Sequence, residues 1–146
     1  MVTGTSGFPS LPRYAAFPSE PVLFRSLVFH AQKIRCDEDR TLFKQGDWPI
    51  GIYLVRSGAV QAIVHGEDGS VAAILHANPG AVLGLPAAVS NKPYSLSALA
   101  RQGSDIAFIS KDDFEILVQS MPELSFAILK VLAAEVQAAR AALVNS

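Results

Sequence analysis

The sequence predicts a mainly β domain, a sandwich or barrel of antiparallel strands, followed by helices. Three observations support this fold class. From Gln32 to about residue 110, short segments rich in β-branched and aromatic residues follow one another at close spacing. Glycine-containing turns separate most of these segments, as they do in hairpin-connected sheets. Beyond residue 110, the apolar residues recur with the period of a helix rather than of a strand.

The N-terminal part is expected to lie outside the sheets. Residues 1–21 contain Gly, Ser, Thr and four prolines, which predicts an irregular arm, with residues 22–146 forming the domain. Pro21 can open a short helix, because proline suits the first helical turn. We expect the strands over about residues 32–110 and the C-terminal helices over about residues 111–144.

Local signals place one hairpin and two helix starts. The stretch from His65 to Ser70 lies between two apolar runs, so it predicts a hairpin loop in which Gly66 and Gly69 supply positive φ angles. Ser110 can cap a helix, and Asp113 three residues later completes a weak capping box. Pro122 then interrupts the chain and starts a second helix.

The second helix, over residues 122–144, predicts a homodimer. Its polar residues form one narrow stripe, and most of the remainder is small and apolar. Such a helix needs two apolar partners, its own domain and the same helix of a second chain. The competing interpretation, a membrane span, requires burying Glu123, Lys130, Glu135 and Arg140 in lipid, so we expect no membrane.

Composition limits the function further. The 146 residues suffice for one domain with its own core, and their net charge of −1 gives no electrostatic reason to expect nucleic acid. A single cysteine, Cys36, suits a reducing, cytoplasmic location. The three histidines do not cluster, and neither a carboxylate pair nor a Ser-His-Asp order is present. We therefore expect no metal site, no resident cofactor and no enzymatic activity.

Two stretches resemble the cyclic nucleotide-binding domain family, which includes the catabolite activator, or Crp/Fnr, type of bacterial regulator. They are LFKQGDWPIGIYLVRSGAVQAIV, from Leu42 to Val64, and IAFISKDDF, from Ile106 to Phe114. The resemblance implies a double-stranded β-helix, or jelly roll, with an N-terminal and a long C-terminal helix, and a sensor role in transcription regulation. Such regulators carry a DNA-binding domain after the long helix, whereas only residues 144–146 follow Leu143. We thus expect a sensor domain without direct nucleic-acid binding.

The family holds its ligand in a phosphate-binding cassette, in which a Gly-Glu pair opens a short helix and an Arg followed by Ser or Thr closes it. Matched by position, the glycine is Gly84 and the hydroxyl residue is Ser95, but Leu85 and Tyr94 replace the two charged residues. Loss of a charged hydrogen bond of about 1.5–3 kcal/mol weakens binding roughly ten- to a hundred-fold. The implied ligand-binding residues are Gly84, Leu85, Pro86, Ala87, Ala88, Lys92, Tyr94, Ser95 and Ser97.

Two functions are compatible with this cassette. The first is a regulatory ligand-sensing module, degenerate for cyclic AMP, that binds a cyclic nucleotide or another small anionic ligand. A ligand near residues 84–97 would change how the C-terminal helix packs against its twin. The alternative is a non-binding scaffold for dimerisation or protein interaction, in which Leu85 fills the pocket that a nucleotide sugar would occupy.

Overall fold

The computed structural model describes residues 20–144, so all but the end of the predicted arm, residues 1–21, lies outside the described residues. The helices are α1 (Pro21–Phe29), α2 (Leu85–Ser90), α3 (Lys111–Ser120) and α4 (Glu123–Val144). The strands are β2 (Gln32–Arg35), β3 (Arg40–Phe43), β4 (Gly51–Ser57), β5 (Val60–His65), β6 (Val71–Ala77), β7 (Val82–Leu83), β8 (Ser97–Ala100) and β9 (Asp105–Ser110).

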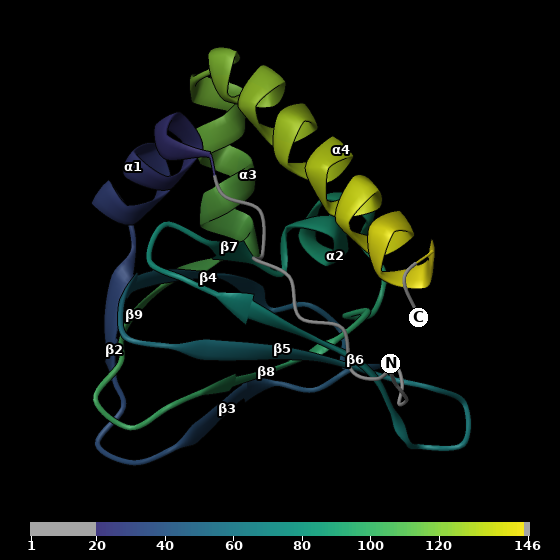
Figure 1. Ribbon diagram of the computed structural model, residues 1–146. Coiled ribbons are helices and arrows are strands. Elements are labelled where there is room, and N and C mark those ends of the chain that lie inside the picture. The colour runs from purple at the N-terminus through teal and green to yellow at the C-terminus, as the bar shows by residue number, and fades with distance from the viewer. Residues whose placement is uncertain (1–19, 145–146) are drawn as a thin grey trace.

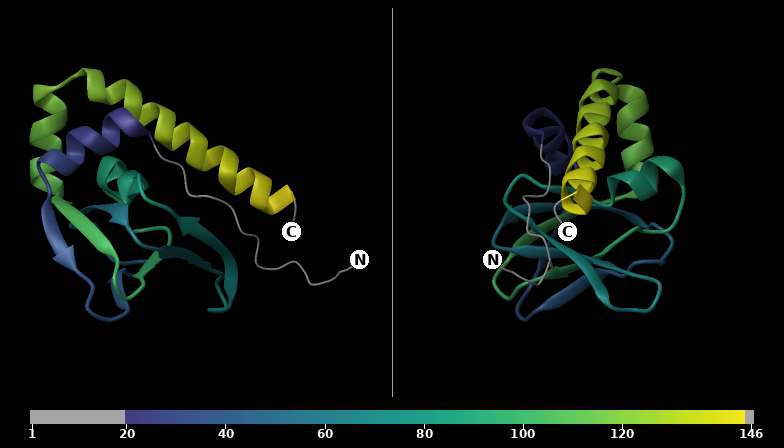
Figure 2. Two further views of the ribbon diagram at one scale, coloured as in Figure 1. Left: turned by 60° about the vertical axis from the view of Figure 1, so that its left-hand side comes forward. Right: turned by 45° about the vertical axis from the view of Figure 1, so that its right-hand side comes forward.

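The strands form two four-stranded antiparallel sheets with the orders β2-β9-β4-β7 and β3-β8-β5-β6. The sheets lie against each other, and the helices gather on one side of the pair (Figures 1 and 2). This arrangement confirms the predicted jelly roll flanked by helices. Alternate residues of the strands point into the space between the sheets, where Tyr53 and Val55 of β4 share one apolar core with Ala62 of β5 and Ala98 of β8.

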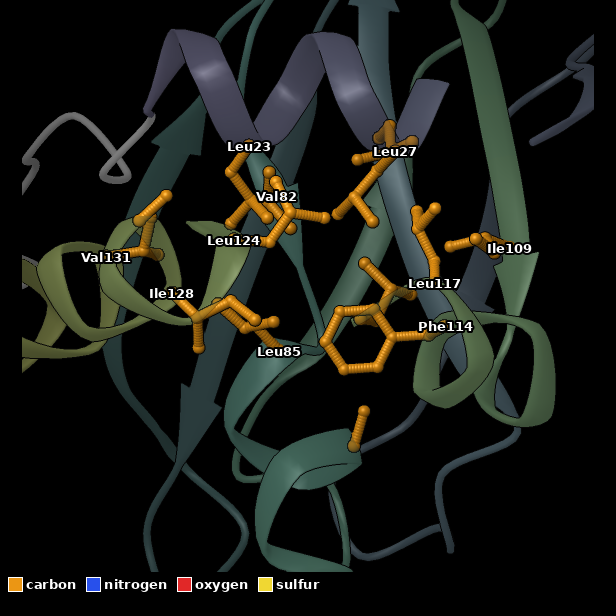
Figure 3. Packing of buried hydrophobic residues seen from close by; sticks show 14 of the residues in the cluster. Leu23, Leu27, Val82, Leu85, Ile109, Phe114, Leu117, Leu124, Ile128 and Val131 are labelled. Atoms are coloured by element: carbon orange, nitrogen blue, oxygen red, sulfur yellow. The ribbon is translucent and has the colours of Figure 1, made fainter. Parts of the chain in front are cut away.

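A second apolar core lies between the β2-β9-β4-β7 sheet and the helices. Figure 3 shows that α1, α3 and α4 all contribute to it. Ile52 and Leu54, which point away from the first core because strand residues alternate, belong to this second one. The buried helical residues of this core are Leu23, Leu27, Leu85, Ala88, Phe114, Leu117, Leu124, Ala127, Ile128 and Val131.

The predicted helix starts are confirmed. The Ser110 hydroxyl accepts a hydrogen bond from the Asp113 amide at 3.1 Å, and α4 begins directly after Pro122. At α1, the Glu20 carboxylate accepts hydrogen bonds from the amides of Val22 and Leu23, a cap that the sequence analysis did not single out. Within residues 20–144, no helix is long and apolar enough to cross a membrane.

The predicted hairpin joins β5 to β6, but the expectation for Gly66 is wrong. Gly69 has a φ of +86°, whereas Gly66 has no positive φ. The Gly69 amide donates to the Gly66 carbonyl at 3.0 Å, and the Gly66 amide donates to the Ser70 carbonyl at 2.8 Å. This turn is closed by the hydrogen bond from Gly69 to Gly66 and lies beside a register shift in the strand pair. Such a turn needs the left-handed conformation only at its last residue, Gly69.

Candidate ligand-binding cassette

Gly84 positions the cassette between the first core and the helices. It is the N-terminal cap of α2 and has a φ of +89°, a left-handed conformation that favours glycine. A Cβ atom at this position would lie 3.0 Å from Cε1 of Tyr94 and 3.2 Å from the carbonyl oxygen of Gly51. The close approach of three chain segments therefore requires a glycine here.

Beside Gly84 lies a cavity of about 10 Å³, lined by β3, α2, the segment before β8 and the second half of α4. Its lining residues are Phe43, Gly84, Pro86, Ala87, Tyr94, Ser95, Leu96 and Glu135. A space of this size accommodates about one water molecule. Sites for drug-sized ligands have volumes of roughly 300–1,000 Å³, so the cassette is closed in this structure.

Five of the nine residues predicted to bind a ligand line this cavity: Gly84, Pro86, Ala87, Tyr94 and Ser95.

The other four predicted residues lie elsewhere. Leu85 and Ala88 are buried in the core between the sheet and the helices, and Lys92 is exposed. Ser97 accepts a hydrogen bond from the Gln45 amide at 2.9 Å and lines a separate groove of about 460 Å³ over β3, β5 and β8.

The structure places Leu85 in the second core and not in the cavity, so it lends no support to the hypothesis that Leu85 fills a sugar pocket. Its side chain lies among residues of α1, α3 and α4, beside Phe114 and Ile128 (Figure 3), and it does not line the cavity. The reason is the orientation of α2, which lies between the sheets and α4 (Figure 1) and turns Leu85 toward the helices. A positional match in sequence does not determine this orientation.

Tyr94 is a buried structural residue. Its ring stacks on Phe43 with the centroids 3.9 Å apart. Its hydroxyl donates to the Gly51 carbonyl at 2.9 Å and accepts from the Ile50 amide at 3.2 Å. Burial raises the pKa of the Tyr94 phenol, so this group remains neutral at physiological pH.

Glu135 is the site residue that the sequence analysis missed. It comes from α4, and its carboxyl is the only Asp, Glu, Lys, Arg or His side chain among the lining residues of the cavity. Its Oε2 atom is buried without a hydrogen-bond partner among the described residues, and burial raises the pKa of the carboxyl to about 7. The available signal was an acidic residue on a helix otherwise rich in small apolar residues.

A family model described as the cyclic nucleotide-binding domain matches residues 33–121. The chain belongs to this family. The search among curated proteins found no match.

Solved structures show the same fold. The catabolite activator protein of Thermus thermophilus is 23% identical, with a TM-score of 0.69 over 84% of this chain and 58% of that one. A putative cyclic nucleotide binding protein from Ruegeria pomeroyi is 27% identical, with a TM-score of 0.60 over 82% and 53%. A cyclic nucleotide-binding domain from Methylobacillus flagellatus is 26% identical, with a TM-score of 0.64 over 78% and 64%. The chain thus spans little more than half of the first two.

The structure also bears on two chemistries other than ligand sensing, namely metal binding and thiol reactivity. Within residues 20–144, no three His, Cys, Asp or Glu side chains are grouped so that they could hold a metal ion. Cys36 is buried, and burial is the main cause that raises the pKa of its thiol, which reduces its nucleophilic fraction at neutral pH.

Proposed function

We propose that this domain is a regulatory ligand-sensing module that is degenerate for cyclic AMP and acts through the repacking of α4 in a homodimer. The observation that carries the proposal is the position of Glu135. This residue of α4 lines the same cavity as Gly84 and Ser95, so a ligand that opens the cassette would also contact α4.

The lining of the cavity supports degeneracy for cyclic AMP. It contains no Lys, Arg or His side chain that could pair with a phosphate. Tyr94, at the position of the family's arginine, is already engaged with Gly51 and Phe43. A bidentate guanidinium–phosphate contact, which gives both energy and geometric specificity, therefore has no counterpart among these residues.

The exposed face of α4 supports the homodimer. Phe126, Leu129 and Val136 are 66%, 60% and 58% exposed. Together with exposed Ala133, they follow one another at intervals of three, four and three residues, the spacing of a coiled-coil seam. Burying this stripe against a second copy would remove apolar surface that monomers rarely expose.

The two faces of α4 suggest how a signal would pass. Glu135 faces the cassette, whereas its neighbour Val136 belongs to the exposed stripe. A ligand that binds one position of α4 better than another shifts the population toward that position, and the dimer seam moves with it.

Calorimetric titration of the purified, ligand-free protein with cyclic AMP and cyclic GMP tests the degeneracy. We expect weak heats or none. Saturable micromolar binding that Ser95→Ala weakens would instead show a functional nucleotide cassette.

Light scattering after size exclusion tests the dimer. We expect a dimer for the wild type and a monomer for Leu129→Glu, because the substitution places a charge in the seam. Ile116→Glu on α3 is the matched control, since Ile116 is 61% exposed but lies on another helix. A wild-type monomer at high concentration contradicts the proposal.

The alternative function, a non-binding scaffold for dimerisation or protein interaction, is favoured by one observation, the closed cavity of about 10 Å³. A scaffold would form the dimer through the stripe on α4, and no small molecule would shift the amide resonances of residues 84–96. A ligand screen by NMR spectroscopy separates the two functions.

A further inference from the structure

One oxygen of the Glu135 carboxyl, Oε2, is buried but has no hydrogen-bond partner among the described residues. An unpaired buried polar atom is destabilising, so native proteins rarely leave one without a protein, water or ligand partner. Glu135 lines the cavity of about 10 Å³, which is large enough for one water-sized group.

The charge of the cavity is opposite to that of a phosphate site. A phosphate in this cavity would lie beside a carboxyl, and like charges disfavour each other. Tyr94 is the other titratable residue of the lining, and its hydroxyl is directed to the Gly51 carbonyl. Lys92 is exposed and does not line the cavity, so it does not compensate for Glu135.

We propose that the cassette is a site for a protonated nitrogen, such as the ammonium group of a small amine, which Glu135 binds as its counter-ion. This inference rests on the proposed ligand-sensing function and specifies the chemistry of the ligand. An ammonium group is close to water in size and has only hydrogen-bond donors, as Oε2 requires. Ser95 lines the same cavity, and its hydroxyl can serve as a second acceptor. The site would thus be charge-inverted relative to that of the family.

Binding should depend on pH, because the carboxyl must be ionised to pair with a cation. In the free protein, burial raises the pKa of Glu135 to about 7, so affinity increases as the pH rises through this value. Among the lining residues only Tyr94 could also titrate, and burial raises its pKa. Lys130 and Arg140 of α4 are exposed and do not line the cavity.

The first probe is methylammonium chloride, titrated at constant ionic strength against sodium chloride and followed by the amide resonances of residues 84–96. At about pH 8 we expect saturable shifts in the wild type and at least about tenfold weaker binding in Glu135→Gln. Glu123→Gln is the matched control, because it removes the same charge from an exposed position of the same helix. This control should bind like the wild type.

A pH comparison and a second variant guard against misfolding effects. Wild-type binding should be about thirtyfold weaker at pH 5.5 than at pH 8, because few of the Glu135 carboxyls are ionised at pH 5.5. The residual binding of Glu135→Gln should not change. Any pH effect that arises outside the cavity is common to both proteins and cancels in this comparison; His65 on β5 and His76 on β6 do not line the cavity. Glu135→Ala, with its fold checked by circular dichroism, should behave like Glu135→Gln.

Three outcomes overturn the inference. Equal methylammonium binding by wild type and Glu135→Gln would place the cation elsewhere. Tighter wild-type binding of cyclic AMP than of methylammonium would refute the charge assignment while leaving the sensing module in place. Saturation with neither probe would mean that the cavity holds at most a water molecule, and with an intact dimer it would favour the scaffold over the sensing module.

Discussion

The hydroxyl group of Tyr94 donates a hydrogen bond to the carbonyl oxygen of Gly51 at 2.9 Å and so connects the cassette to the first residue of β4. The same hydroxyl accepts from the Ile50 amide. Tyr94, which the sequence match places at the position of the family's arginine, is a neutral side chain that ties the cassette to the jelly roll.

Tyr94→Phe tests this connection. The ring and its stacking on Phe43 remain, but the Gly51 carbonyl loses a donor in a buried environment. We expect a loss of about 1–3 kcal/mol in the free energy of unfolding, measured by urea denaturation. An unchanged midpoint with an unchanged slope would show that the hydrogen bond contributes nothing.

Gly84→Ala should destabilise the domain by more than backbone strain alone. The left-handed conformation costs a non-glycine residue about 1–2 kcal/mol, and the new Cβ would also press on Tyr94 and Gly51. Gly69→Ala is the control, because Gly69 has a similar φ of +86° but open space around it. Equal losses in thermal stability would contradict the close packing at Gly84.

Two substitutions at Leu85 test whether the side chain belongs to the ligand site, as its positional match to the family's glutamate implies, or to the apolar core, as its burial indicates. Leu85→Ala removes a fully buried side chain and should cost about 2–5 kcal/mol. Leu85→Glu restores the residue type of the family but places a carboxylate in the apolar core, so it should destabilise the protein further. Neither variant should gain affinity for cyclic AMP in calorimetry. A stable Leu85→Glu protein that binds cyclic AMP would disprove the orientation of α2.

Glu135 should make stability fall as the pH rises. Its pKa is about 7 in the folded state and 4.5 as the unperturbed value, so the folded state binds the proton more strongly. The contribution is fully present below about pH 4.5 and is lost as the pH rises through about 7. Its full size is on the order of 3 kcal/mol.

The check is the difference in urea midpoint between pH 5 and pH 8, in a buffer free of ammonium and amines. Wild type and Glu123→Gln should lose stability relative to Glu135→Gln, in which position 135 does not titrate. Parallel pH profiles for all three proteins would rule out a buried carboxyl.

Much of the fold could be predicted because its signals are local. Each of these signals depends on a few consecutive residues: the Ser110 cap, Pro21 at the start of α1, Pro122 directly before α4, and the hairpin of β5 and β6. The wrong prediction for Gly66 has the same origin. The local sequence does not distinguish Gly66 from Gly69, and only the hydrogen bonds of the folded turn show that Gly69 alone has a positive φ.

The sequence by itself determined the strands, the Ser110 cap and the residues of the cassette segment, because periodicity and turn chemistry act over a few residues. Only the tertiary structure decided which side chains reach the cavity. The packing of α2 between the sheets and α4 turned Leu85 away and brought in Glu135, fifty residues later in the chain. The character of the site arises from such long-range packing, which no local pattern encodes.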